Sequence, residues 1–322
     1  MHSKPLTVAV TGASGFIGKL ICPFLAGAGH KIRAYDFRQT ALTRLLNLRI
    51  GGPFSESQFA LLPARADLLL GLCQKRLRPA LFKLLSSGGK GPDIRSDLTG
   101  WVERFQGCDV VIHLAAIPHP NVPGLTTRNY ESINYEGAVN IYQAAKQAGV
   151  PRFIYASSCQ TYFINRFSGW KQFPIREEDA DAIQSFFRPH DYGYLKWLFE
   201  NYLKEHSKRD GISSVALRLE MPGLWGASAA NLFIQTSVEN LQQAFLLSCI
   251  SQITHGAHIL NIADDWIPES LTNLMEYTRL RWPGVPCQPG KNTSLLCLKR
   301  AKDVLEYSPV SKGRYFQAKS IF

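Results

Sequence analysis

Short apolar runs separated by helix-like stretches dominate the pattern of this chain. Such runs are typical of strands buried on both faces, as in a parallel sheet. They cover residues 6–10, 31–35, 109–116, 152–158 and 213–219, and residues 133–148 have the character of a helix. Strands that alternate with helices in this order predict an α/β fold with a doubly wound parallel sheet.

The turn after the first run carries three glycines at the spacing G-x-x-G-x-x-G and then opens a helix. Gly12 can make the tight turn, Gly15 lets the backbone approach a phosphate, and Gly18 allows close helix–strand packing. The N–H groups and the dipole of a helix N-terminus attract anions. The turn therefore predicts a dinucleotide site on a Rossmann-type sheet.

A carboxylate follows the second run. Asp36 lies roughly 20 residues after the glycines, where an acid hydrogen-bonds an adenosine ribose. Asp36 therefore favours NAD over NADP. Ligands collect at the carboxyl ends of parallel strands. The residues expected around one crevice there are Gly12, Asp36, Ala115, Ala116 and Ser158.

Length and composition suit one large core with a smaller lobe, since the chain has 322 residues and 45% of them are apolar. We expect an NAD-binding domain at 1–219 and a substrate-binding lobe at 220–322, from which about 258–264 returns to the sheet. No apolar run approaches the roughly 18 residues that suggest a membrane span, and the N-terminus lacks a signal-like pattern. These features predict a cytoplasmic protein.

Metal and disulfide chemistry find little support. The seven cysteines are odd in number and show no C-x-x-C spacing, which is typical of scattered reduced thiols. His255 and His258 have no acidic or cysteine partner nearby, so we expect no metal site.

Candidate catalytic residues lie in the segment Tyr192-Gly193-Tyr194-Leu195-Lys196. At i, i+4 spacing, Tyr192 and Lys196 share one face of a helix. There the ammonium is expected to lower the pKa of the phenol from about 10, which would make Tyr192 an acid/base near neutral pH. Ser158 could steady the same substrate oxygen.

In combination, several segments resemble the extended short-chain dehydrogenase/reductase superfamily, in its NAD-dependent epimerase/dehydratase group. They are 11–18, 113–116, Asn134, 156–158 and 192–196. The resemblance implies Ser158, Tyr192 and Lys196 as a catalytic triad. It also implies Asp97 and Leu98 beside adenine, and Asn134 in either cofactor contact or structural support. The full set expected to bind NAD is Gly12, Ser14, Gly15, Phe16, Ile17, Gly18, Asp36, Asp97, Leu98, Leu114, Ala115, Ala116, Asn134, Tyr192 and Lys196.

The connection from Glu220 to Ser237 is too short to form a wall around a nucleotide-sugar, and in this it looks like the compact uronate dehydrogenases. That similarity favours a small carbohydrate or hydroxy-acid substrate. The chain departs from those enzymes by having Cys159-Gln160 after the paired serines and no arginine between 220 and 237, which argues against uronate specificity. The candidate substrate residues are Cys159, Gln160, Thr161 and Trp225.

An extra segment at about 40–92 carries eight basic and two acidic residues, a net +6 of the chain's +11. Its leucine-rich part could form a basic amphipathic helix. Three interpretations stay open: a helical flap over the cofactor domain or a dimer partner, a peripheral contact with an anionic membrane, and a disordered or anomalous insertion. Nucleic-acid binding is not expected, because the segment has no recognition motif or aromatic stacking array. The resemblance favours a homodimer.

Together these features predict an NAD-dependent oxidoreductase that oxidises a small carbohydrate-like alcohol, which could be a sugar, a sugar acid or a hydroxy acid. Tyr192 would take the hydroxyl proton while hydride leaves the same carbon for the nicotinamide. One alternative is a sugar epimerase or dehydratase that returns the hydride. Another is a non-catalytic NAD-binding regulator that uses the insertion as its interaction surface.

Overall fold

The computed structural model describes residues 4–37, 92–95, 97–118, 124–164, 169–188, 191–223, 232–266, 273–287 and 293–310. The insertion predicted at about 40–92, apart from residue 92, and the candidate substrate residue Trp225 lie outside these ranges. The interpretations of the insertion therefore stay predictions.

Six parallel strands form one sheet in the order β2-β1-β3-β4-β5-β6. They are β1 (Thr7–Thr11), β2 (Lys31–Tyr35), β3 (Val110–His113), β4 (Arg152–Ser158), β5 (Ser213–Leu219) and β6 (Gly256–Asn261). The chain runs from β1 to β2 on one side and then crosses to β3 on the other. The predicted doubly wound sheet is confirmed, and its switch point lies between β1 and β3.

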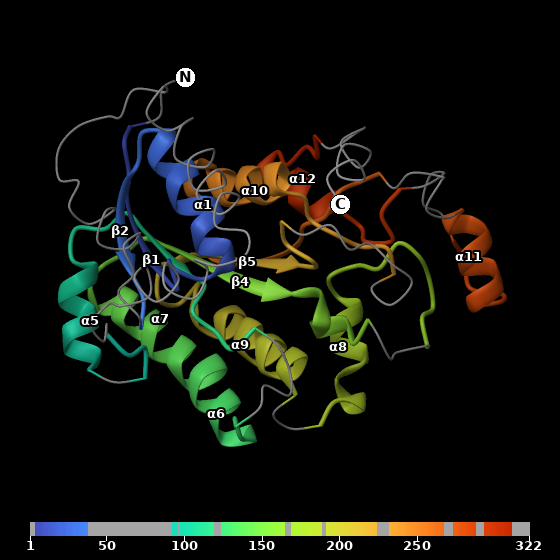
Figure 1. Ribbon diagram of the computed structural model, residues 1–322, viewed down its shortest axis with the longest axis horizontal. Helices are drawn as coiled ribbons and strands as arrows, with labels where there is room; N and C mark the ends of the chain where they lie inside the picture. The colour runs from blue at the N-terminus through green and yellow to red at the C-terminus, as the bar shows by residue number, and fades with distance from the viewer. Residues whose placement is uncertain are drawn as a thin grey trace, which may run out of the picture.

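Helices cover both faces of the sheet (Figure 1). One face carries α1 (Phe16–Gly27), α10 (Val238–Ile250) and α12 (Lys299–Leu305), and the other carries α5 (Leu98–Phe105), α7 (Gly137–Gln147) and α9 (Tyr192–His206). Side chains along each strand alternate between the two layers: Val8 and Val10 pack in one apolar core, and Ala9 packs in the other. Burial on both faces explains why the strands read as apolar runs.

Shorter elements complete the described chain. They are α6 (Thr127–Glu131), the π-helical η1 (Ser132–Glu136), the 3₁₀ turn η2 (Cys159–Tyr162), α8 (Asp179–Ala182), the 3₁₀ turn η3 (Gln184–Phe186) and α11 (Leu274–Arg281). In Figure 1, α8 and α11 lie beyond the ends toward which the β4 and β5 arrows point.

Three predicted boundaries are wrong by several residues. The helix expected at 133–148 begins six residues earlier, at Thr127. The Asn129 side chain accepts a hydrogen bond from the Thr126 N–H at 2.8 Å, which caps the helix at this earlier position. β3 ends at His113 instead of 116, where the chain turns past the glycine loop. The strand expected at 258–264 is β6, which ends at Asn261 where its pairing with β5 ends.

The C-terminal segments pair with residues from the middle of the chain. Phe173 and Ile175 form isolated parallel bridges with Cys287 and Leu296. These bridges join a part of the chain before residue 219 to segments after it. The division of the chain at 219 remains a prediction.

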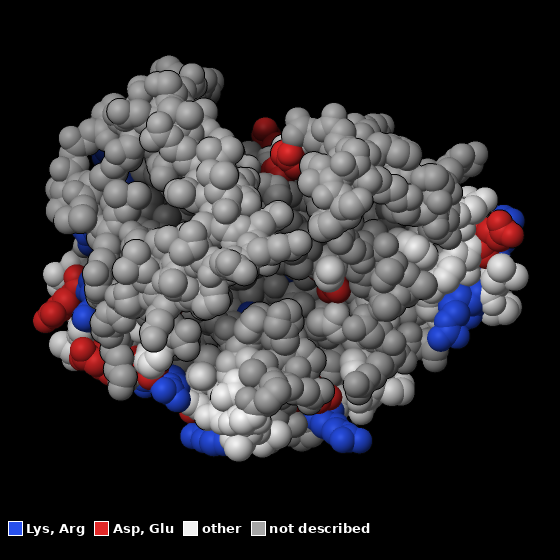
Figure 2. Space-filling view, viewed as in Figure 1, with Lys and Arg blue, Asp and Glu red and all other residues white. Residues whose placement is uncertain are grey.

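Charged side chains of both signs lie over α5 and α11 on the face seen in Figure 2. α5 carries Glu103 and Arg104, and α11 carries Glu276, Arg279 and Arg281. Over these two helices the described surface therefore mixes the two charges. Within the described ranges, no helix is long and apolar enough to cross a bilayer.

Candidate active site

The turn after β1 is packed so closely that its first glycine is required. Gly12 has a φ of +73°, and a β-carbon on it would lie 2.6 Å from the Ala115 nitrogen and 2.9 Å from the Leu114 carbonyl carbon. A β-carbon on Gly18 would lie 2.6 Å from the carbonyl carbon of Ala13. The turn is therefore held between the start of α1 and the loop that follows β3.

The start of α1 suits a diphosphate. Gly15 is its N-cap in an extended conformation, no side chain from the described ranges caps this end, and its first turn holds no acidic residue. Phe16 and Ile17 follow, so backbone N–H groups and the helix dipole form the anion-binding end. Asp36 lies beside the turn, where its Oδ2 accepts a hydrogen bond from the Ser14 N–H at 2.9 Å. The residues present here therefore fit a dinucleotide.

Asp97, which is expected beside adenine, caps the N-terminus of α5, and its Oδ1 accepts a hydrogen bond from the Gly100 N–H at 2.9 Å. Leu98 is the first residue of that helix, and Leu114, Ala115 and Ala116 are half-buried after β3. These residues line the same side of the switch point as the glycine turn.

Asn134 supports the loop after β3. It is buried in the π-helical turn η1, where its Oδ1 accepts from the Ile117 N–H at 2.7 Å and its Nδ2 donates to the Ile117 carbonyl at 3.1 Å. Both polar ends of the amide are thus used by backbone. Of its two expected roles, the geometry favours structural support.

The three candidate catalytic side chains meet at the carboxyl end of β4. Ser158 is the last residue of that strand, Tyr192 is the first residue of α9, and Lys196 lies one turn further along. Gly193 allows α9 to pack closely against η2, because a β-carbon there would lie 2.7 Å from the Gln160 carbonyl carbon and 2.8 Å from Phe187 Cε1. In the sequence, this contact is marked by the glycine inside the Tyr-Gly-Tyr segment.

Burial controls the titration of the pair on α9. Burial raises the pKa of Tyr192, its hydrogen bond with Ser158 lowers it, and the charge of Glu220 raises it. Burial lowers the pKa of Lys196 to about 7, which the charge of Glu200 partly opposes. The Lys196 Nζ donates to the Ala156 carbonyl at 2.7 Å and lies 5.6 Å from the centre of the Tyr192 ring. The prediction that the pKa of the phenol is lowered is wrong for this arrangement, because burial raises it.

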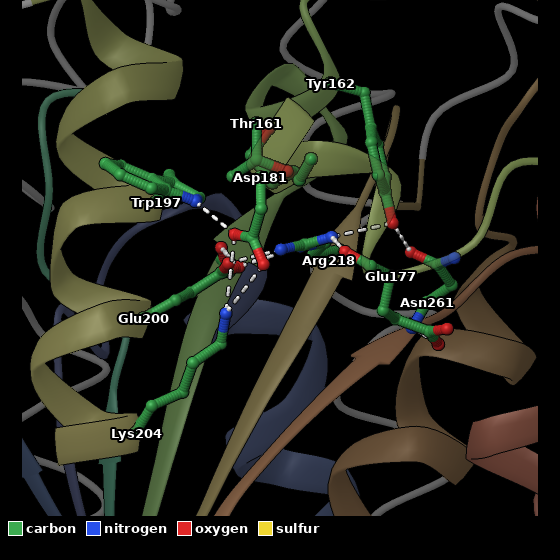
Figure 3. Close-up of polar contacts among 12 residues, drawn as sticks. Thr161, Tyr162, Glu177, Asp181, Trp197, Glu200, Lys204, Arg218 and Asn261 are labelled. Atoms are coloured by element: carbon green, nitrogen blue, oxygen red, sulfur yellow. Dashed lines mark hydrogen bonds and ion pairs between the residues drawn. The ribbon is translucent and has the colours of Figure 1, made fainter. Parts of the chain in front are cut away.

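A buried ion pair joins α9 to β5 (Figure 3). Glu200 follows Lys196 by one turn of α9 and faces Arg218 of β5, whose Nε and Nη2 donate to it at 3.0 and 2.6 Å. Arg218 Nη1 also donates to the Tyr162 hydroxyl and to the Glu177 carbonyl, both at 2.7 Å. This network ties α9 to the sheet and to the residues beyond η2. Sequence reasoning missed it, since neither charge stands in a motif.

The candidate substrate residues differ in how deeply their side chains are buried. Cys159 is fully buried and packs in the apolar core, and the hydroxyl of the equally buried Thr161 donates to the Ser158 carbonyl at 2.9 Å. The structure therefore does not place these two side chains in an open pocket. Gln160 is half-buried, and its Nε2 lies 3.3 and 3.5 Å from the carboxylate oxygens of Glu220.

Glu220 is a site residue that sequence reasoning did not single out. It follows the last residue of β5 and is only 8% exposed. Burial raises the pKa of its carboxyl to about 7, and the hydrogen bond from Gln160 works in the opposite direction. The available signal was its position, because an acid directly after a buried strand lies at the ligand-binding edge of a parallel sheet.

Comparisons with known proteins indicate the family and the fold of this chain. The model of the NAD dependent epimerase/dehydratase family matches residues 8–241. A 3-beta-hydroxysteroid dehydrogenase of Mycolicibacterium neoaurum is 28% identical over 232 residues, which cover 70% of this chain and 50% of that protein. An L-arabinose 1-dehydrogenase (NAD(P)(+)) of Haloferax volcanii is 29% identical over 130 residues, 39% of this chain and 50% of that protein. The chain thus spans about half the length of these curated relatives.

Among solved structures, glucuronic acid dehydrogenase from Chromohalobacter salexigens superposes with a TM-score of 0.59 at 16% identity, covering 98% of this chain and 88% of that one. At this identity the likeness shows the fold.

Proposed function

The chain belongs to the NAD-dependent epimerase/dehydratase family and has a Rossmann-type fold. Within that family we propose that it is an NAD-dependent dehydrogenase of a small carbohydrate-like alcohol. The observation that carries the proposal is the meeting of Ser158, Tyr192 and Lys196 at the end of β4, on the same edge of the sheet as the glycine turn. The two curated relatives described above are both dehydrogenases, which favours net oxidation.

In this proposal each side chain has a separate task. Tyr192 Oη acts as the phenolate, which takes the proton of the substrate hydroxyl while hydride leaves the same carbon, so the alcohol becomes a carbonyl. Because burial raises the pKa of this phenol, a positive charge beside it, from the Lys196 ammonium or from a bound nicotinamide, would be needed to favour the phenolate. Ser158 donates a hydrogen bond to the reacting oxygen and orients it. When bound, NAD supplies the hydride acceptor. The glycine turn would hold its diphosphate, Asp36 its adenosine ribose and Lys196 its nicotinamide ribose.

Tyr192→Phe tests the mechanism. The substitution removes the proton acceptor and keeps the ring, so we expect turnover to be lost while NAD binding is retained. NADH absorbance measures turnover on a panel of aldoses, polyols, uronic acids, hydroxy acids and a 3β-hydroxysteroid, and calorimetry measures NAD binding. Tyr194→Phe, two residues along the same helix, is the matched control and should keep full activity. Full activity in Tyr192→Phe would refute the assignment.

A sugar epimerase or dehydratase is the second candidate, because the family as a whole is described by those reactions. Such an enzyme returns the hydride to the substrate, so no NADH accumulates. Product analysis by NMR on NADH-silent substrates distinguishes it from a dehydrogenase. Tight NAD binding without any product would instead favour a regulator.

A further inference from the structure

Glu220 is a buried carboxyl group at the catalytic edge of the sheet that the hydride transfer described above does not use. β4 and β5 pair in parallel with Ser158 opposite Leu219, so Glu220 lies beside the residues that follow Ser158. Its charge acts on Tyr192, where it raises the pKa of the phenol. The carboxyl group therefore lies near the residues that carry the Ser158 and Tyr192 hydroxyl groups.

The partners of this carboxylate are weak. Among the described residues, its hydrogen bonds come only from Gln160 Nε2, at 3.3 and 3.5 Å. Glu200 differs: it is fully buried, and it accepts two hydrogen bonds from Arg218 and one from the Ser157 hydroxyl at 2.5 Å. A buried carboxylate is costly unless its oxygens are satisfied. Glu220 thus keeps acceptor capacity that the described part of the protein does not fill.

Gln160, which donates to Glu220, also contacts Ser158. Its backbone N–H donates to Ser158 Oγ at 3.1 Å, and its half-buried amide meets Glu220. A carboxylate offers only acceptors, whereas an amide offers both donors and acceptors. Together, the carboxylate and the amide can accept hydrogen bonds from neighbouring hydroxyl groups of a ligand, and the amide can also donate to one of them.

We propose that Glu220 and Gln160 form a recognition pair for the hydroxyl groups of a neutral, polyhydroxylated substrate, with Glu220 as the specificity-determining residue. The inference rests on the proposed function and narrows its substrate class to uncharged sugars or polyols. A uronate or hydroxy acid would bring a second carboxylate against Glu220, and the connection at 220–237 contains no arginine to offset it. A steroid would desolvate the carboxylate without supplying several donors.

Glu220→Gln tests the pair, because it keeps the shape and removes the charge. We expect the wild type to oxidise neutral aldoses and polyols in preference to the uronates of the same configuration. In Glu220→Gln, KM for the neutral sugar should rise roughly 10- to 100-fold, as expected for losing hydrogen bonds to a charged acceptor, and the preference over the uronate should shrink. The change in kcat should be smaller than the change in KM, and it should not be a loss, because the charge of Glu220 raises the pKa of Tyr192. In the wild type KM should fall as pH rises through about 7, and in the variant it should not. The exposed Glu178→Gln is the control.

A second measurement does not depend on turnover. In the Tyr192→Phe background with NAD present, calorimetry should detect binding of the neutral sugar, and Glu220→Gln should weaken it. Such binding, in a protein whose wild type makes no NADH, would refute the dehydrogenase proposal and leave the recognition pair supported.

Several results would overturn the recognition pair itself. They are turnover with a preference for uronates or steroids, an unchanged KM in Glu220→Gln, and no binding of any neutral sugar. If Glu220→Gln does not fold, Glu220→Asp retracts the carboxylate by one methylene. KM should then rise by a smaller factor, and an unchanged KM would again refute the pair.

Discussion

At the residue scale, burial opposes the charged forms of the groups that would do the chemistry. The pKa of Lys196 falls to about 7, while those of Tyr192 and Glu220 rise. Buried ionisable groups with shifted pKa values are typical of active sites that transfer protons near neutral pH. The i, i+4 spacing of Tyr192 and Lys196 could be predicted from sequence, but their desolvation could not, because it depends on the strands and loops packed around them.

The cost of holding Glu220 ionised should appear as a pH dependence of stability. Its carboxyl pKa is 4.5 in the unfolded chain and about 7 in the fold, so the folded state binds the proton more tightly between these values. Stability from this group is present below pH 4.5 and is lost as pH rises through 7, a change of about 3 kcal/mol.

Glu220→Gln removes that loss. Relative to the wild type, the variant should therefore gain unfolding free energy between pH 5 and pH 8, measured by urea denaturation at each pH. The exposed Glu178→Gln should show no such gain. Parallel curves for Glu220→Gln and the wild type would contradict a desolvated carboxyl at this position.

At the element scale, the site depends on how closely α9 approaches the turn after β4. The two elements meet at Gly193, where a side chain would overlap the backbone of Gln160. Backbone atoms cannot move aside as the end of a flexible side chain can. The start of α9, and with it Tyr192, is therefore positioned by the absence of a β-carbon.

Gly193→Ala should displace Tyr192 from Ser158. We expect a loss of turnover of on the order of 100-fold, as misplacement of about 1 Å costs, with NAD affinity kept. Gly137→Ala is the matched helical control, since its β-carbon would press on the Ile94 side chain, at 2.8 Å from Cδ1 and 2.9 Å from Cγ1, and would lie 3.4 Å from the nearest backbone atom, the Ser132 carbonyl oxygen. Equal activity in the two variants would argue against close packing as the positioning device.

On the scale of the whole molecule, the Arg218 network connects parts that are distant in sequence. Arg218 joins Glu200 of α9 to Tyr162 of η2, and the Tyr162 hydroxyl donates to Asn261 of β6 at 2.6 Å (Figure 3). Asn261 in turn donates from its side chain to the Ile175 and Cys297 carbonyls. The catalytic helix, the sheet and the C-terminal segments thus share one buried polar network.

Arg218→Met should destabilise the protein by roughly 3–5 kcal/mol, because it leaves Glu200 buried without its partner. Lys299→Met breaks an exposed pair with Asp303 and should cost no more than about 1 kcal/mol. Unfolding in urea measures both. Adding Glu200→Met to Arg218→Met should recover part of the loss, and a double variant less stable than Arg218→Met would show that the pair is not the source of the effect.

Sequence by itself determined the strands, the glycine turn and the spacing of Tyr192 and Lys196, because each of these is encoded by residues within a few positions of one another. It predicted β2, β4 and β5 to the residue, since these strands are bounded by their own apolar runs. The tertiary structure alone decided which polar groups meet. Gln160 and Glu220 are 60 positions apart, and Arg218 and Glu200 are 18 apart, so their pairing depends on the neighbouring strands and on α9. Burial in that packing also raises the pKa of Glu220, and no local sequence pattern predicts that burial.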